Sequence, residues 1–197
     1  MPSSDGLAKR CRVSRCARNH DLQDFKGVYI NLIKFPEGYP PAIGKYLYMM
    51  EDVRERTLNY IQGLTVEQLS WHPNPRVESI GTLLLHIAAI EFSYIQEDIM
   101  QREMGEEWKI AFPIRFNIPQ ISGKELDYFV DKLNEVRNET KAILKTLTDE
   151  DLNREITLHD SGDSPTKFSI EWILYHLVEH EAHHKGQIAV MKRLLKK

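Results

Sequence analysis

The chain of 197 residues lacks the features that define several large classes of protein. No stretch approaches the roughly eighteen consecutive apolar residues of a membrane-spanning helix, and no apolar core follows the basic residues near the N-terminus, as it would in a signal peptide. We therefore expect a cytoplasmic protein with no membrane partner. Charges of the two signs are nearly balanced, with 26 Lys or Arg against 29 Asp or Glu. No excess of positive charge is available to hold a phosphate backbone, so we expect no nucleic-acid partner.

The chain also contains little cysteine. The two cysteines, Cys11 and Cys16, lie in a basic, polar stretch where His20 is the one further metal ligand nearby. A cysteine-based zinc site needs four ligands, usually in two spaced pairs, so free thiols are the favoured interpretation and we assign these residues no function. Phosphate-binding loops and nucleotide-binding glycine motifs are also absent from the sequence.

The N-terminal part of the chain differs in charge from the rest. Residues 1–36 hold seven Lys or Arg against three Asp or Glu, and the first 24 residues show no sustained apolar periodicity. Such a composition is typical of a flexible segment, and the prolines at positions 36, 40 and 41 separate it from the rest of the chain. We predict a flexible basic extension over residues 1–38 and one domain over residues 39–197. A basic arm that binds anions is the alternative for the extension.

Apolar residues recur at steps of three and four along four long segments. This periodicity predicts an all-α protein, a four-helix bundle with long connections. The second segment is apolar nearly all round in its first half, which indicates a helix buried between its neighbours. The predicted helices cover approximately residues 41–63, 80–104, 122–147 and 169–197.

The connections carry their own signals. Thr65 with Gln68, and Ser122 with Glu125, match the capping-box pattern, which predicts a short helical turn at the first pair and the start of the third helix at the second. Residues 156–158 are rich in β-formers and predict a short strand that folds back at residues 161–163.

Histidines are the best candidates for chemistry. On the fourth helix His180 and His184 share one face with apolar residues, so both imidazoles should point toward the bundle core. Residues four apart on a helix have Cβ atoms about 5 to 6 Å apart, and two imidazoles so placed can bind one metal ion. His86 on the buried second helix is the candidate for a third ligand. Three histidines with an open fourth position are typical of a catalytic metal centre.

Two other interpretations of the histidines need consideration. Each histidine alone is explained as a core residue satisfied by hydrogen bonds, but two buried imidazoles four residues apart favour metal binding. Residues 176–184 also match both the H-x-x-E-H and the H-E-x-x-H motifs of zinc peptidases. The thirteen residues after His184 contain no His, Asp, Glu or Cys to act as the further ligand of a zincin. The sequence also argues against a di-iron carboxylate site, because the chain has a single E-x-x-H motif and such a site needs two.

The segments SIGTLLLHIAAIE and EWILYHLVEHEAHHKGQI resemble the DinB-like superfamily of metal-binding four-helix bundles, also called DinB/YfiT-like. The resemblance covers about residues 39–197. It implies an up-down-down-up bundle, frequently a homodimer, that binds one divalent metal through one histidine of the second helix and two on the last. In this chain these are His86, His180 and His184, the trio already selected from helical geometry, whereas His183 would not itself be a ligand.

Family members of known activity are thiol-dependent S-transferases or isomerases that use bacillithiol, mycothiol or glutathione. The resemblance therefore implies a thiol-dependent S-transferase acting on a small electrophile, with one divalent metal, zinc or nickel, that favours the thiolate form of the sulfur. A hydrolase that uses a metal-bound water is one alternative. A bundle that binds metal or dimerises without catalysis is another.

Polar residues next to the proposed ligands could support them. Glu181 and Gln187, with His183, are candidates for orienting an imidazole or lining a pocket, and Gln187 lies closest in angle to the ligand face. For Glu91 and Glu179 a solvated charge on the outer face of the bundle is at least as good an interpretation. We assign no general base.

Overall fold

A computed structural model describes residues 32–111, 120–157 and 166–195 of the chain. The chain divides into two compact units, residues 1–33 and 34–197, and the second unit holds all the elements described below. Most of the predicted basic extension (residues 1–31), Cys11 and Cys16, and the predicted turn at residues 161–163 lie outside the described residues.

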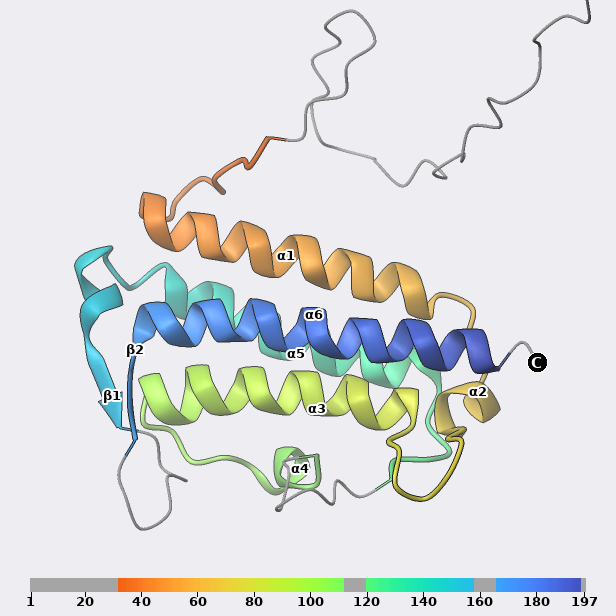
Figure 1. Cartoon of the computed structure of the whole chain (residues 1–197). Helices are drawn as coiled ribbons and strands as arrows, with labels where there is room; N and C mark the ends of the chain where they lie inside the picture. Colours follow the sequence, from red (N-terminus) through yellow and green to blue (C-terminus); the bar gives the residue numbers. More distant parts are fainter. Residues whose placement is uncertain (1–31, 112–119, 158–165, 196–197) are drawn as a thin grey trace, which may run out of the picture. The chain divides into compact units, whose positions relative to one another are not determined.

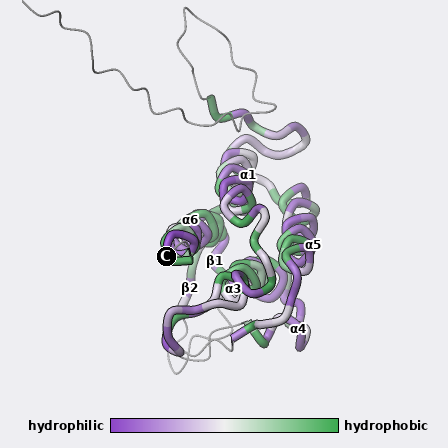
Figure 2. The backbone as a smooth tube through the Cα atoms, turned by 90° about the vertical axis from the view of Figure 1, so that its right-hand side faces the viewer, coloured by the Kyte–Doolittle hydropathy of each residue, from purple (hydrophilic) through white to green (hydrophobic). Residues whose placement is uncertain are grey.

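Four long helices make up the body of this unit. They are α1 (Pro41–Ile61), α3 (Ile80–Phe92), α5 (Leu126–Leu144) and α6 (Ile170–Leu194). α1 packs against α6 and α5, and α3 packs against the same two helices. The helices therefore surround a common interior, as the view along them shows (Figure 2). α1 and α6 run in one direction, and α3 and α5 run in the opposite direction (Figure 1). The all-α prediction is confirmed.

The connections contain short elements only. The predicted strand exists as β1 (Glu155–Thr157), which pairs antiparallel with β2 (Lys167–Ser169) so that Ile156 lies opposite Phe168. The short elements are α2 (Val66–Ser70), η1 (Ser93–Ile99), α4 (Glu106–Lys109), η2 (Glu150–Asn153), β1 (Glu155–Thr157) and β2 (Lys167–Ser169).

One of the two predicted capping boxes is present. The Thr65 side chain accepts a hydrogen bond from the Gln68 backbone, and the Gln68 side chain accepts one from the Thr65 backbone. The capping box predicted at Ser122 is wrong, because α5 begins only after Glu125, which makes no side-chain cap bond. Gly123 has a φ of 70°, a left-handed conformation that a helix cannot contain, so the chain is still turning at the predicted start of the helix.

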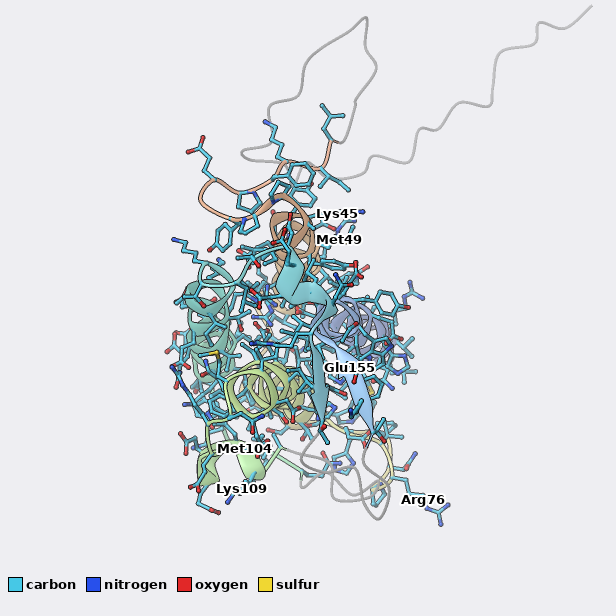
Figure 3. The ribbon with its side chains drawn as sticks, turned by 90° about the vertical axis from the view of Figure 1, so that its left-hand side faces the viewer. Lys45, Met49, Arg76, Met104, Lys109 and Glu155 are labelled. Atoms are coloured by element: carbon cyan, nitrogen blue, oxygen red, sulfur yellow. The ribbon has the colours of Figure 1, made fainter. Side chains whose placement is uncertain are left out.

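The second predicted helix ends earlier than its apolar pattern suggests. α3 continues into the π-helical segment η1, which ends at Ile99, and Gln101 then adopts a φ of 55°. This left-handed residue stops the helix before Met104, the predicted end. Met104 is nevertheless buried, because the following chain brings it back against the core beside α4 (Figure 3).

Two apolar clusters fill the interior. One is built around Leu84, Trp108 and Phe129 at the α2 end of the helices, and the other around Leu47 and Ile173 at the end that carries the strands. Between them each long helix contributes one charged residue to the core. These four residues, which we call the buried charge cluster, are Arg54, Glu91, Arg137 and Glu181.

The buried charge cluster pairs its charges with good geometry. The Arg54 guanidinium donates from Nε to Glu181 Oε1 and from Nη2 to Glu91 Oε2, both at 2.8 Å. Arg137 donates to both oxygens of Glu91, at 2.7 and 2.9 Å. Each of the four residues is at most 5% exposed, so the interpretation of Glu91 as a solvated charge is wrong. Two positive and two negative charges neutralise one another, which is what makes their burial tolerable.

Both guanidinium groups also bind backbone oxygens, and Arg137 Nη1 donates in addition to Glu51 Oε1 at 2.9 Å. Arg54 Nη1 donates to the Leu133 carbonyl at 2.8 Å, and Arg137 Nη1 donates to the Met50 carbonyl at 2.9 Å. The two arginines thus tie α1 and α5 together directly, in addition to linking both helices to the glutamates of α3 and α6. The relative axial positions of all four helices depend on these contacts.

Loss of one buried charge should destabilise the protein strongly. Arg54→Met should lower the free energy of unfolding by about 3 to 5 kcal/mol, because it leaves two buried carboxylates to share Arg137, with Glu181 held by a single 3.5 Å contact. Arg56→Met is the matched control on the same helix, since Arg56 pairs with Asp52 at the exposed surface, and it should cost at most about 1 kcal/mol. Urea denaturation measures both. Equal losses for the two variants would contradict this account.

The cluster should also make stability depend on acid. Burial alone raises the pKa of the Glu91 carboxyl, but the charges of Arg137 and Arg54 outweigh it and lower that pKa to about 2 from an ordinary value of 4.5. The stabilisation is therefore complete above about pH 4.5 and is lost as the pH falls toward 2. Glu91→Gln should be less stable than the wild type at pH 7, and the difference should shrink through this window. A difference that stays constant with pH would be inconsistent with a paired Glu91.

Candidate metal centre

Three histidines from two helices converge on one point. His86 comes from α3, and His180 and His184 come from successive turns of α6. His180 Nε2 lies 3.1 Å from His86 Nε2 and 3.1 Å from His184 Nε2. Nitrogens bound at about 2.0 to 2.1 Å to one ion, at angles between octahedral and tetrahedral, stand about 2.9 to 3.4 Å apart. These three residues, the histidine cluster, can therefore hold one metal ion.

Hydrogen bonds on the far side of two rings set the protonation of the nitrogens. The His86 Nδ1 lies 3.0 Å from the Ala111 carbonyl oxygen, and the His184 Nδ1 lies 2.6 Å from Gln187 Oε1. Both partners are acceptors, so each Nδ1 carries the proton and each Nε2 presents a lone pair. A single proton on His180 Nε2 cannot satisfy two such lone pairs with good geometry. A cation at the centre satisfies all three.

Burial keeps these imidazoles neutral. It lowers the pKa of His86 and, with the neighbouring histidines, lowers that of His180 to about 2. Burial also lowers the pKa of His184 to about 4, although the Gln187 hydrogen bond opposes the fall. At neutral pH all three rings are therefore uncharged, which is the form that binds metal.

The buried charge cluster holds both ligand helices in place. Glu181 follows His180 directly on α6, and Glu91 lies five residues after His86 on α3. The sequence makes Glu181 a candidate partner of a ligand imidazole, but its carboxylate accepts from Arg54 and Arg137 instead. The reason is geometric, since Glu181 points into the bundle, where the guanidinium groups lie, and is only 2% exposed.

The other predicted site residues take different positions. Gln187 orients His184 through the hydrogen bond to Nδ1. His183 is exposed and does not belong to the histidine cluster, although its ring centroid lies 5.2 Å from that of His184. His176 stacks on Trp172 with ring centroids 4.8 Å apart, and it also lies beside His180, at 5.8 Å.

Sequence reasoning missed three partners of the site. Ala111 acts through its backbone, so no side-chain pattern could have revealed it. Arg54 and Arg137 did leave a signal, because each occupies a helical position four residues after a buried apolar residue, Met50 and Leu133 respectively. A charge on an apolar stripe indicates a buried ion pair when an opposite charge occupies a similar position on another helix.

The histidine cluster leaves room for further ligands. Within residues 32–111, 120–157 and 166–195, no fourth His, Cys, Asp or Glu joins the three. An ion bound there would keep at least one coordination position for water or substrate, as catalytic metal sites do.

Comparison with known proteins agrees with this geometry. The model of the DinB superfamily matches residues 49–188, a stretch that contains all three clustered histidines. The chain belongs to the DinB superfamily. The resemblance inferred from the two histidine segments is confirmed.

Individual relatives are distant in sequence. The uncharacterized protein YizA of Bacillus subtilis is 28% identical over 145 residues, which cover 73% of this chain and 82% of that protein. A DinB-like protein from Bacillus cereus has a similar structure, with a TM-score of 0.60 and 22% identity over 77% of this chain and 91% of that one. A conserved protein from Enterococcus faecalis gives a TM-score of 0.58 at 17% identity, covering 77% and 96%. These structures support the fold of the DinB-like domain.

None of the helices in the described part of the chain is both long enough and apolar enough to cross a membrane.

Two adjacent histidines offer a sharp test of the centre. His184→Ala should weaken zinc binding by more than the roughly 10- to 100-fold typical of losing a residue that only orients a ligand, because it removes a nitrogen ligand. Gln187→Ala should fall within that range, since it frees the His184 ring to rotate. His183→Ala should leave zinc affinity unchanged. Competition with a chromophoric chelator measures all three, and equal losses at positions 183 and 184 would refute the ligand assignment.

Proposed function

We propose that this DinB-superfamily protein is a divalent-metal-dependent enzyme that transfers a low-molecular-weight thiol to a small electrophile. The observation that carries the proposal is the convergence of three neutral imidazole nitrogens, two of them on rings oriented by hydrogen bonds, with no fourth protein ligand among the described residues. A divalent ion held there, zinc or nickel, supplies a Lewis acid that favours the thiolate form of a thiol at neutral pH.

The protein's own residues supply position and environment. Ala111 and Gln187 fix the rotation of His86 and His184, so the nitrogens are aimed before any ion arrives. The apolar surroundings of α3 lower the local dielectric, which strengthens the attraction between an ion and a sulfur anion. The arginines of the buried charge cluster are neutralised by their glutamates and do not compete for an anionic substrate.

The first experiment is a conjugation assay on the full chain loaded with zinc or nickel. Bacillithiol, mycothiol and glutathione are each offered with 1-chloro-2,4-dinitrobenzene, and the thioether product is followed by absorbance. In this reaction a carbon–sulfur bond forms, the carbon–chlorine bond breaks, chloride leaves with the bonding electrons, and the thiol proton passes to solvent. We expect turnover with at least one thiol that disappears in metal-free protein and in His180→Ala, whereas Arg56→Met retains it.

The same preparation separates this proposal from its alternatives. Metal-dependent cleavage of p-nitrophenyl acetate without added thiol, together with no conjugation, would indicate a hydrolase that uses the same open site. A bound metal with neither activity would leave a metal-binding bundle. We also propose that the protein forms a homodimer in the cytoplasm, which sedimentation velocity and cell fractionation would test.

A further inference from the structure

A pocket of about 510 Å³ lies between α6 and the start of α3, together with the segment that precedes α3. This volume is within the range of about 300 to 1,000 Å³ that small-molecule sites occupy. Gln187, which orients His184, is part of its lining, and so is Leu83, which lies one helical turn before His86. A molecule in the pocket would therefore sit beside Gln187, on the Nδ1 side of the His184 ring.

The lining of the pocket is mainly apolar. Val77, Leu83 and Met191 form its walls, and Val190 and Leu194 remain partly exposed at its margin, at 53% and 37%. The polar members are a single carboxylate, Glu78, together with His183 and Gln187. Such a surface suits an apolar body and disfavours an anion near Glu78.

Gly186 leaves part of the pocket wall without a side chain. The residue lies in the interior of α6 and lines the pocket, and it is not one of the glycines that adopt a positive φ. The helix thus has no backbone need for glycine there, and glycine weakens a helix relative to alanine. A Cβ at this position would meet no atom within 4 Å, so packing does not demand glycine either. What a side chain at position 186 would do is fill the pocket.

We infer that the pocket binds the apolar body of the electrophilic substrate, a neutral or cationic small molecule, and that Gly186 determines how large that body can be. The inference rests on the proposed function for the identity of the reaction. The thiol co-substrates are polar and match the apolar walls poorly, and a thiol that carries carboxylates, such as glutathione, would also meet the negative charge of Glu78. The electrophile is the partner whose chemistry fits.

Binding of linear primary amides tests the inference without any turnover. Butanamide, hexanamide and octanamide are titrated calorimetrically into the metal-loaded and the metal-free full chain. Because each added methylene buries more apolar surface, affinity should rise about threefold to fourfold per methylene. Gly186→Leu should weaken octanamide binding at least tenfold, while zinc stoichiometry stays at that of the wild type.

Ala182→Leu is the matched control. It places the same side chain on an exposed position of the same helix that does not line the pocket, so octanamide should bind as in the wild type. Octanoate should bind more weakly than octanamide, and Glu78→Gln should narrow that difference because it removes the repelling charge.

Several results would overturn the inference. One is an amide affinity that does not change with the length of the amide chain, and another is a Gly186→Leu variant that binds octanamide as tightly as the wild type. A third is displacement of octanamide by glutathione, which would assign the pocket to the thiol. A wild-type dimer that dissociates in Gly186→Leu would instead place a second copy of the chain on this face. Failure of the proposed reaction would leave the amide results intact, so the two claims fail separately.

Discussion

Four charged side chains buried between two apolar clusters constrain the relative positions of the four long helices. Each long helix contributes one of them, and a guanidinium or carboxylate left without its partner in such surroundings costs several kcal/mol. A helix that slid or rotated would break ion pairs with two of its neighbours at once. Apolar packing alone allows many similar helix arrangements. The hydrogen bonds donated by Arg54 and Arg137 form in only one of them. We interpret the buried charge cluster as the element that gives the bundle its register.

The histidine cluster depends on that register directly. Its residues come from α3 and α6, the two helices that carry the glutamates of the buried charge cluster, so the positions of His86 and His180 are fixed through Glu91 and Glu181. The three imidazoles are neutral because they are buried, and two of them are already oriented by carbonyl oxygens. The bundle therefore presents lone pairs that repel one another unless a cation lies between them. An apolar pocket lies beside Gln187, the residue that orients His184, and we propose that this pocket binds the substrate.

Much of this arrangement could be predicted from the sequence, because helical periodicity reports which residues face inward. It located the four helices, the strand at Ile156 and the three clustered histidines. The apolar periodicity did not predict helix ends that depend on local backbone conformation. At Gly123 and Gln101 a left-handed φ prevents helix, although the apolar pattern continues past both residues. The periodicity also failed where polarity and burial conflict. Charge normally indicates exposure, which favours the outer surface for Glu91, and only the positions of Arg54 and Arg137 on other helices reverse that expectation.

The central claim is that His86, His180 and His184 hold one divalent metal ion. Elemental analysis of the full chain, purified without a histidine tag and compared with His86→Ala, tests it most directly. The account predicts about one metal per chain in the wild type and none in the variant, with both proteins equally helical by circular dichroism. A wild type without metal even after reconstitution, or a variant with the same metal content, would contradict it.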